Sequence, residues 1–156
     1  MTHLLVVCLG NICRSPMGEG ALKHHIQRQG LASAYSVDSA GTSPWHQGKP
    51  ADKRAVSCAK SHGVDIAMVR SRQIDPMDFQ RCEWILCADT SNYQDVCRQS
   101  PSELVHKVVL WLPWPNVDGP NDIPDPYTGG EAGFEYVWDL VDRAAYNTLI
   151  RLTNAG

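Results

Sequence analysis

The chain has 156 residues, of which 43% are hydrophobic and 20% charged, and its formal net charge at pH 7 is -3. This length is typical of one domain (1–156), and this composition is typical of globular rather than disordered or fibrous proteins. The negative net charge argues against a nucleic-acid or membrane-surface binder, because such proteins need a cationic face.

The sequence contains no apolar run long enough for a signal peptide or a membrane span. Six cysteines in a chain without an export signal are expected to remain thiols in a reducing compartment, so we predict a cytoplasmic protein. The absence of a C-x2-C pair argues against a zinc ribbon.

Strands and helices are predicted to alternate from the N-terminus onward. The short apolar run 4–8 predicts a strand that is buried on both faces. A helix follows, beginning with Ser15 as its cap and Pro16 in its first turn, and ending before Gly30. Further strands are predicted at 35–37, 84–87 and 107–110, and further helices at 52–61 and 90–98.

The C-terminal third combines a long irregular segment with a long helix. Segment 113–130 is too rich in Pro, Gly, Asp and Asn to be regular, and its length suggests a functional loop. Segment 131–153 carries apolar residues on one stripe and predicts an amphipathic helix packed on the sheet. The alternation of strands and helices predicts an α/β fold with a mostly parallel sheet, which binds ligands at the carboxyl ends of its strands.

The loop after the first strand carries the clearest chemical signal, because five residues separate Cys8 from Arg14 and Ser15 follows directly. Five residues allow the backbone to curl around a tetrahedral oxyanion such as inorganic phosphate, with its N–H groups turned inward and a helix N-terminus behind them. Gly10 and Asn11 tolerate the left-handed backbone that such a curl requires. The loop residues expected at the substrate are Leu9, Gly10, Asn11, Ile12, Cys13 and Ser15.

Cys8 and Arg14 have the chemistry of a phosphoryl-transfer site. Inward amides, Arg14 and the Ser15 hydroxyl would favour a thiolate at Cys8, which makes that sulfur a nucleophile. The planar guanidinium of Arg14 can hold two phosphoryl oxygens at once. For Cys13 two interpretations stay open, since it can pack within the loop or form a reversible disulfide with Cys8.

Several blocks of the sequence resemble the low-molecular-weight protein tyrosine phosphatase family, and together they cover essentially the whole chain. The blocks are VCLGNICRSPM at 7–17, DSAGT at 38–42 with Trp45, Asp52 and Arg54, the segment from Arg72-Gln73 to 89–92, and PDPY at 124–127 with Gly129, Gly130 and Phe134.

The resemblance implies one domain with a four-stranded parallel sheet, helices on both of its faces, and a phosphate-binding loop after the first strand. It implies hydrolysis of phosphotyrosine in protein substrates, and of small aryl phosphates, through a cysteinyl-phosphate without a metal or organic cofactor. By position, Cys8 is the implied nucleophile, Arg14 the phosphate clamp and Asp125 the proton donor. Trp45 and Tyr127 are implied as aromatic walls of the cavity.

The chemistry of the leaving group also favours Asp125 as the acid. A carboxylic acid that delivers a proton to the phenolic oxygen assists its departure, and the resulting carboxylate can then activate water. Asp125 stands between two prolines, which stiffen its loop. Two positions depart from the family pattern. Val69 replaces a common histidine, and Thr128 replaces a second aromatic residue after Tyr127.

Other functions use the same features. An arsenate reductase on this scaffold would pass oxidation from the loop cysteine to Cys82 and Cys87, although a cysteine at the end of a buried strand is more often inert. A phosphopeptide-binding or thiol-redox module would use the loop without catalysis. A papain-type Cys/His hydrolase lacks motif support around its histidines.

Overall fold

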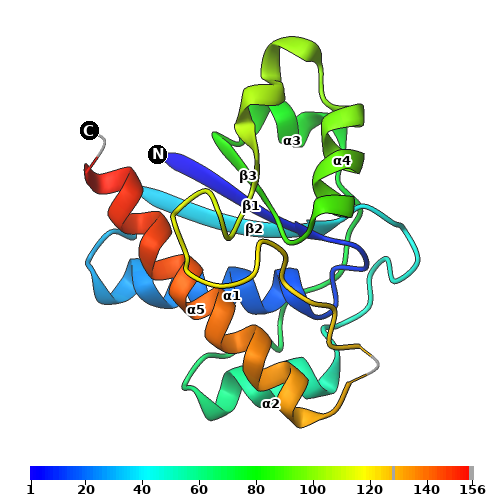
Figure 1. Ribbon diagram of the computed structural model, residues 1–156, viewed down its shortest axis with the longest axis vertical. Coiled ribbons are helices and arrows are strands. Elements are labelled where there is room, and N and C mark those ends of the chain that lie inside the picture. Colours follow the sequence, from blue (N-terminus) through cyan, green and yellow to red (C-terminus); the bar gives the residue numbers. More distant parts are fainter. Residues whose placement is uncertain (128, 155–156) are drawn as a thin grey trace.

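Four parallel strands form the sheet on which the rest of the chain is built, in this computed structural model (Figure 1). They are β1 (Thr2–Cys8), β2 (Tyr35–Gly41), β3 (Trp84–Cys87) and β4 (Val108–Leu110), in the spatial order β2-β1-β3-β4. Cys8 at the end of β1 lies opposite Gly41 of β2, and Val7 lies opposite Cys87 of β3. The expected four-stranded parallel sheet is confirmed. The structure describes residues 1–127 and 129–154. Thr128, which stands where the family pattern has a second aromatic residue, lies outside these ranges.

Helices cover both faces of the sheet, as expected (Figure 1). On one face lie α1 (Arg14–Arg28), α2 (Lys53–Ser61) and α5 (Glu131–Asn154). On the other lie α3 (Pro76–Arg81), α4 (Thr90–Gln99) and the 3-10 helix η1 (Ser102–Lys107).

The side chains of β1 explain why both faces must be covered. Leu4, Val6 and Cys8 belong to the core shared with α1, α2 and α5, whereas Leu5 and Val7 belong to the core on the opposite face. All five are buried, as the continuous apolar run predicts for a central strand of a parallel sheet.

The start of α1 differs from the prediction. The helix begins at Arg14, and its N-terminal cap position is Cys13, whose side chain makes no capping hydrogen bond. Ser15 is therefore already inside the helix, and its hydroxyl lies 3.1 Å from the Cys8 sulfur. The predicted cap was wrong because this serine contacts the sulfur instead of the helix backbone.

The sequence prediction also missed two short elements and half of a strand. The helix α3 is set by a capping box between Asp75 and Asp78 with Pro76 in its first turn, and η1 follows Pro101. Strand β2 continues past the predicted 35–37 to Gly41 because every one of its residues pairs with β1. Pairing with the central strand outweighs the low strand propensity of Asp, Ser and Gly.

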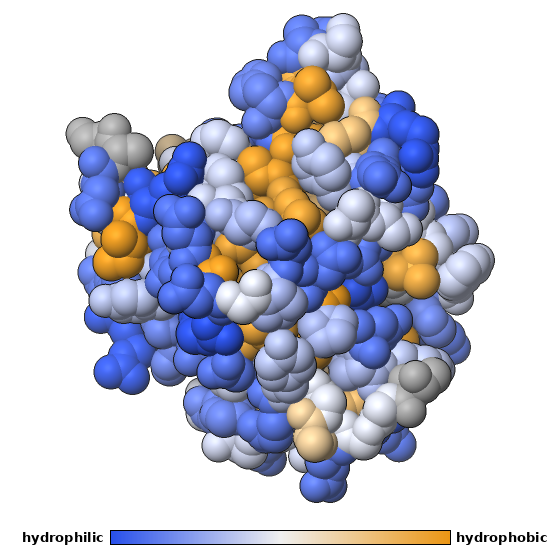
Figure 2. Space-filling view, viewed as in Figure 1, coloured by the Kyte–Doolittle hydropathy of each residue, from blue (hydrophilic) through white to orange (hydrophobic). Residues whose placement is uncertain are grey.

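Apolar residues appear on the face shown in Figure 2 only as narrow strips between hydrophilic ones. This pattern agrees with helices that turn their apolar stripes toward the sheet. In the part of the chain that the structure describes, every helix is too short or too polar to cross a bilayer.

Trp111 anchors the C-terminal helix to the end of β4. Its ring is fully buried, and its indole Nε1 donates a 2.9 Å hydrogen bond to Oγ1 of the buried Thr148 on α5. Gly18 of α1 allows this packing, since a Cβ there would lie 2.6 Å from the ring. The buried indole N–H thus depends on one hydroxyl acceptor.

We predict that Thr148→Val lowers the free energy of unfolding by about 1–3 kcal/mol, because valine keeps the shape but leaves the buried N–H without an acceptor. Urea denaturation measures the change. The control is Thr153→Val near the exposed end of the same helix, where the expected change is within about 0.5 kcal/mol. Equal losses in the two variants would contradict the role of this hydrogen bond.

Candidate active site

The loop between β1 and α1 curls back so that its donors face the sulfur of Cys8. Asn11 adopts a left-handed backbone with φ 57°, which turns its N–H toward Cys8 Sγ at 3.3 Å. The Ser15 hydroxyl approaches the same sulfur from the first turn of α1. Donors so placed stabilise negative charge on sulfur, and α1 adds the positive end of its dipole.

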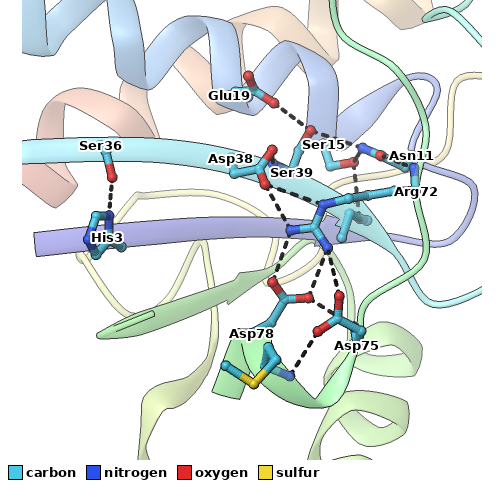
Figure 3. A network of polar contacts seen from close by, with 12 residues as sticks. His3, Asn11, Ser15, Glu19, Ser36, Asp38, Ser39, Arg72, Asp75 and Asp78 are labelled. Atoms are coloured by element: carbon cyan, nitrogen blue, oxygen red, sulfur yellow. Dashed lines mark hydrogen bonds and ion pairs between the residues drawn. The ribbon is translucent and has the colours of Figure 1, made fainter. Parts of the chain in front are cut away.

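Asn11 fixes the conformation of this loop through hydrogen bonds of its side chain to three other residues. Its side chain is fully buried, and Nδ2 donates to Ser15 Oγ at 2.7 Å and to Ser39 Oγ at 3.0 Å. Its Oδ1 accepts a hydrogen bond from the backbone N of Arg72 at 3.0 Å. The Ser39 hydroxyl in turn donates to the buried carboxylate of Glu19 on α1 (Figure 3). Asn11 and Ser15 therefore act from behind the loop, as supports of the sulfur.

A second set of contacts holds the loop from the segment before α3. The Ser71 hydroxyl donates to the carbonyl of Gly10 at 2.8 Å. Arg72 forms ion pairs with Asp38 at 2.8 Å and with the buried Asp78 at 2.9 Å (Figure 3). Val69, which replaces a common family histidine, packs against the apolar core instead. On this side, Ser71 and Arg72 supply the polar contacts to the loop.

Arg14 is buried and held in one orientation. Its NH1 donates to Asp89 Oδ2 at 2.6 Å and to the carbonyl of Ile123 at 3.0 Å, while its NH2 lies 4.0 Å from Asp125 Oδ2. Burial opposes the charged guanidinium, but the nearby Cys8, Asp89 and Asp125 outweigh it and raise the pKa of Arg14 above its ordinary value. The guanidinium therefore stays charged beside the sulfur.

The two carboxylate oxygens of Asp89, at the junction of β3 and α4, accept hydrogen bonds from different partners. Its Oδ2 accepts the hydrogen bond from Arg14, and its Oδ1 accepts one from the backbone N of Asn92 at 2.7 Å, which caps α4. The position of the Arg14 guanidinium is thus tied to the start of α4, which lies on the face of the sheet opposite α1.

The loop forms the floor of a cavity of about 210 Å³. Its lining comprises Cys8, Leu9, Gly10, Ile12, Cys13, Arg14, Trp45, His46, Asp125 and Tyr127. The sequence prediction does not include His46, which packs against the loop so closely that a Cβ on Gly10 would lie 2.9 Å from its ring. Trp45 is 72% exposed and Tyr127 48% exposed, so both aromatic rings stand at the mouth.

The candidate acid stands across the mouth on segment 113–130. The Asp125 side chain is half exposed, and its Oδ1 accepts a 3.0 Å hydrogen bond from the backbone N of Tyr127. Arg54 holds this segment by donating to the carbonyl of Tyr127 at 2.8 Å and by pairing with Asp52 at 3.0 Å. Because the backbone N of Asp52 donates to the carbonyl of Ile12, the start of α2 joins the acid segment to the loop.

Comparison with known proteins decides the family. The sequence model described as "Low molecular weight phosphotyrosine protein phosphatase" matches residues 3–155. The chain belongs to this family. The human low molecular weight phosphotyrosine protein phosphatase is 39% identical over 137 residues, which cover 86% of this chain and 85% of that protein.

Two solved structures support the family assignment. A protein tyrosine phosphatase from Entamoeba histolytica with Hepes in its active site is 36% identical, with a TM-score of 0.95 over 99% of both chains. Wzb from Vibrio vulnificus in complex with benzylphosphonate is 31% identical, with a TM-score of 0.84 over 96% of this chain and 98% of the other. The expected family, fold and enzyme class, a protein tyrosine phosphatase, are thereby confirmed.

One glycine of this phosphatase permits the close approach of β2 to the loop. A Cβ on Gly41 would lie 2.6 Å from the carbonyl oxygen of Leu9 and 3.2 Å from the backbone N of Asn11. Both neighbours are backbone atoms, so neither can turn aside as the end of a side chain could. The family block at 38–42 thus includes a residue whose missing side chain shapes the site.

The other cysteines of the phosphatase differ from Cys8 in their surroundings. Burial, together with the charge of Asp52, raises the pKa of Cys13 to about 12. Burial likewise raises the pKa of Cys82 to about 11 and that of Cys87 well above its usual value. These thiols stay protonated at neutral pH, which makes them slow nucleophiles.

We predict that Asp89→Asn weakens the binding of inorganic phosphate by about 10- to 100-fold, since it removes the charge that holds Arg14. Asparagine has one acceptor oxygen, so it can cap α4 or accept from Arg14 but not both, and the free energy of unfolding should fall as well. Competitive inhibition by phosphate and urea denaturation measure the two effects.

The matched control is Asp122→Asn, because Asp122 accepts a hydrogen bond from Thr90 at the start of the same helix. It should leave phosphate binding unchanged. If both variants bind phosphate equally well, Asp89 does not position the clamp.

Proposed function

We propose that this phosphatase hydrolyses phosphotyrosine in protein substrates, and small aryl phosphates, through a cysteinyl-phosphate intermediate. One observation carries the proposal: the Cys8 sulfur, the Arg14 guanidinium and the Asp125 carboxyl group line the same cavity. A nucleophile, a clamp for the phosphoryl oxygens and an acid for the leaving group are the parts that such a reaction needs.

In the first step, the Cys8 thiolate attacks phosphorus while the bond from phosphorus to the tyrosine oxygen breaks. Asp125, in its acid form, gives its proton to that oxygen, so tyrosine leaves as a neutral phenol. Charge on the three equatorial oxygens is stabilised by the fixed Arg14 and by the inward amides of the loop. The products of this step are the dephosphorylated tyrosine side chain of the substrate and phosphocysteine at Cys8.

In the second step, water attacks the phosphocysteine, and the Asp125 carboxylate takes a proton from it. The bond from phosphorus to sulfur breaks, which returns the thiolate and releases inorganic phosphate. The Asn11 amide, at 3.3 Å, and the Ser15 hydroxyl, at 3.1 Å, stabilise the departing sulfur anion. One carboxyl group thus serves both steps.

The walls of the cavity favour an aromatic ester. Trp45 and Tyr127 stand at its mouth with exposed rings, where they can stack on the ring of phosphotyrosine. A phosphoserine side chain is shorter and has no ring, so it gains less from these walls. The benzylphosphonate in the complex of Vibrio vulnificus Wzb is likewise a phosphonate attached to an aromatic group.

We further propose that the reaction needs no metal ion and takes place in the cytoplasm. The buried, charged Arg14 supplies the positive charge that a metal ion provides in other phosphoryl-transfer enzymes. All six cysteines are free in the structure, and a reducing compartment keeps the nucleophilic sulfur in its active form.

An arsenate reductase is the main alternative, and the cysteines argue against it. Cys82 and Cys87 are buried and their pKa values are raised by burial, so neither offers a ready thiolate to a bound arsenate. Activity assays on phosphotyrosine, phosphoserine and arsenate side by side separate these functions.

We predict that Cys8→Ser abolishes hydrolysis of phosphotyrosine, since a serine hydroxyl in this loop is far less ionised than a thiol. The variant should still bind inorganic phosphate, because the amides and Arg14 remain. Phosphate release without added metal, in the presence of a chelator, measures activity. Turnover by Cys8→Ser at the wild-type rate would refute the mechanism.

We predict that Asp125→Asn lowers kcat for phosphotyrosine by about 10²–10⁴. The loss should be smaller for an aryl phosphate with an acidic leaving group, because such a phenolate departs without a proton. A loss of the same size for both substrates would mean that Asp125 is not the acid.

A further inference from the structure

Three metal-ligating side chains meet between α2 and α5, away from the Cys8 cavity. Cys58 on α2 and His62 at its C-terminal end are four residues apart, and Glu135 lies on the facing part of α5. One sulfur, one ring nitrogen and one carboxylate oxygen lie within 4.8 Å of one another. The proposed mechanism uses none of these three residues.

We propose that Cys58, His62 and Glu135 form a binding site for a single zinc ion. Zinc takes thiolate, imidazole and carboxylate ligands at about 2.0–2.3 Å in a tetrahedron, which separates the ligand atoms by about 3.5 Å. Cys58 Sγ lies 3.5 Å from Glu135 Oε1, and His62 Nε2 lies 2.8 Å from Glu135 Oε2. The three ligand atoms lie within 4.8 Å of one another, so the widest separation exceeds the tetrahedral spacing by at most about 1.3 Å, which small side-chain movements would have to close.

The ligand set selects a particular class of metal ion. A thiolate excludes the hard ions magnesium and calcium, which prefer oxygen ligands, and favours zinc or a similar transition metal. One thiolate and one carboxylate also cancel the charge of a divalent cation. With zinc bound, the site as a whole would therefore be neutral beside Lys53 and Arg54, which line the adjoining cavity.

Neighbouring groups hold the ligands ready for an ion. The His62 ring stacks on Trp138, with centroids 5.3 Å apart and an interplanar angle of 14°, which limits its rotation. An adjoining cavity of about 360 Å³, lined in part by Cys58 and Glu135, leaves room for a water molecule as the fourth ligand. Three protein ligands and one open position are common in zinc sites that are not purely structural.

Hydrogen bonds occupy the site when no ion is bound. The Cys58 thiol donates to Glu135, and His62 shares a hydrogen bond with the other oxygen of the same carboxylate. Burial, and then this hydrogen bond to Glu135, raises the pKa of Cys58 to about 12. Zinc binding would replace both hydrogen bonds and release the thiol proton to solvent.

A zinc ion at this place would join α2 to α5 beside the acid segment. Arg54 lies one helical turn before Cys58, stacks on Phe134 at 4.8 Å and binds the carbonyl of Tyr127. The ion would thus clamp the two helices that support Arg54, without touching the Cys8 loop.

The test is a cobalt and zinc titration of the Cys8→Ser chain, which removes the active-site thiol as a competing ligand. One equivalent of cobalt should give the thiolate-to-cobalt charge-transfer band and the visible bands of a tetrahedral site, and zinc should displace it. At a free zinc concentration about 100-fold above Kd, Tm should rise by about 5–10 °C. Cobalt binding without a thiolate band, or no binding at micromolar concentrations, would overturn the proposal.

Two variants in the same background complete the test. His62→Gln changes a partly exposed residue and should fold normally, yet it should weaken cobalt and zinc binding by about 10-fold or more and, at the same free zinc concentration, reduce the zinc-dependent rise in Tm by about half or more. His106→Gln, at an exposed histidine in η1, is the control and should bind as the parent does. Equal metal affinity in the two variants would refute the site.

Discussion

The site depends on one physical constraint: a sulfur anion, and then a phosphate dianion, must be held at the buried end of a central strand. Charge in such a place is costly unless donors already point at it. The left-handed Asn11 meets this need by turning its N–H to Cys8, while its buried side chain fixes Ser15 and Ser39. Buried polar groups such as Glu19 and Asp78 therefore support the loop between β1 and α1, through Ser39 and Arg72, rather than the apolar core of the protein.

The sequence was sufficient to predict the parts of the fold and site that are local in the chain. The apolar run of β1, the Cys8 to Arg14 spacing and the presence of a helix directly after them are short-range features, so they can be deduced without tertiary contacts, whereas the cap of that helix could not. Asp125, by contrast, looks like an ordinary turn residue when taken alone. Its assignment depended on the family resemblance, and the structure places it 4.0 Å from Arg14.

Residues to which sequence reasoning gave no role in the site act through contacts between distant segments. Asp89 reaches Arg14 across 75 positions, Arg72 reaches Asn11 across 61, and Arg54 reaches Tyr127 across 73. Each looks like a surface charge or a helix cap in the sequence, and only the meeting of strand ends at one edge of the sheet brings them together. The short helices α3 and η1 were missed for a different reason, since six residues are too few to show a periodic pattern.

The measurement that tests the central claim most directly is detection of the covalent intermediate. Rapid acid quench during hydrolysis of phosphotyrosine, followed by mass spectrometry of the peptides, shows which residue carries phosphate. The mechanism predicts phosphate on the sulfur of Cys8, formed fast enough to account for turnover and accumulating when the Asp125 carboxyl group is replaced. Phosphate on another residue, or full turnover by an enzyme that never becomes phosphorylated, would contradict the account.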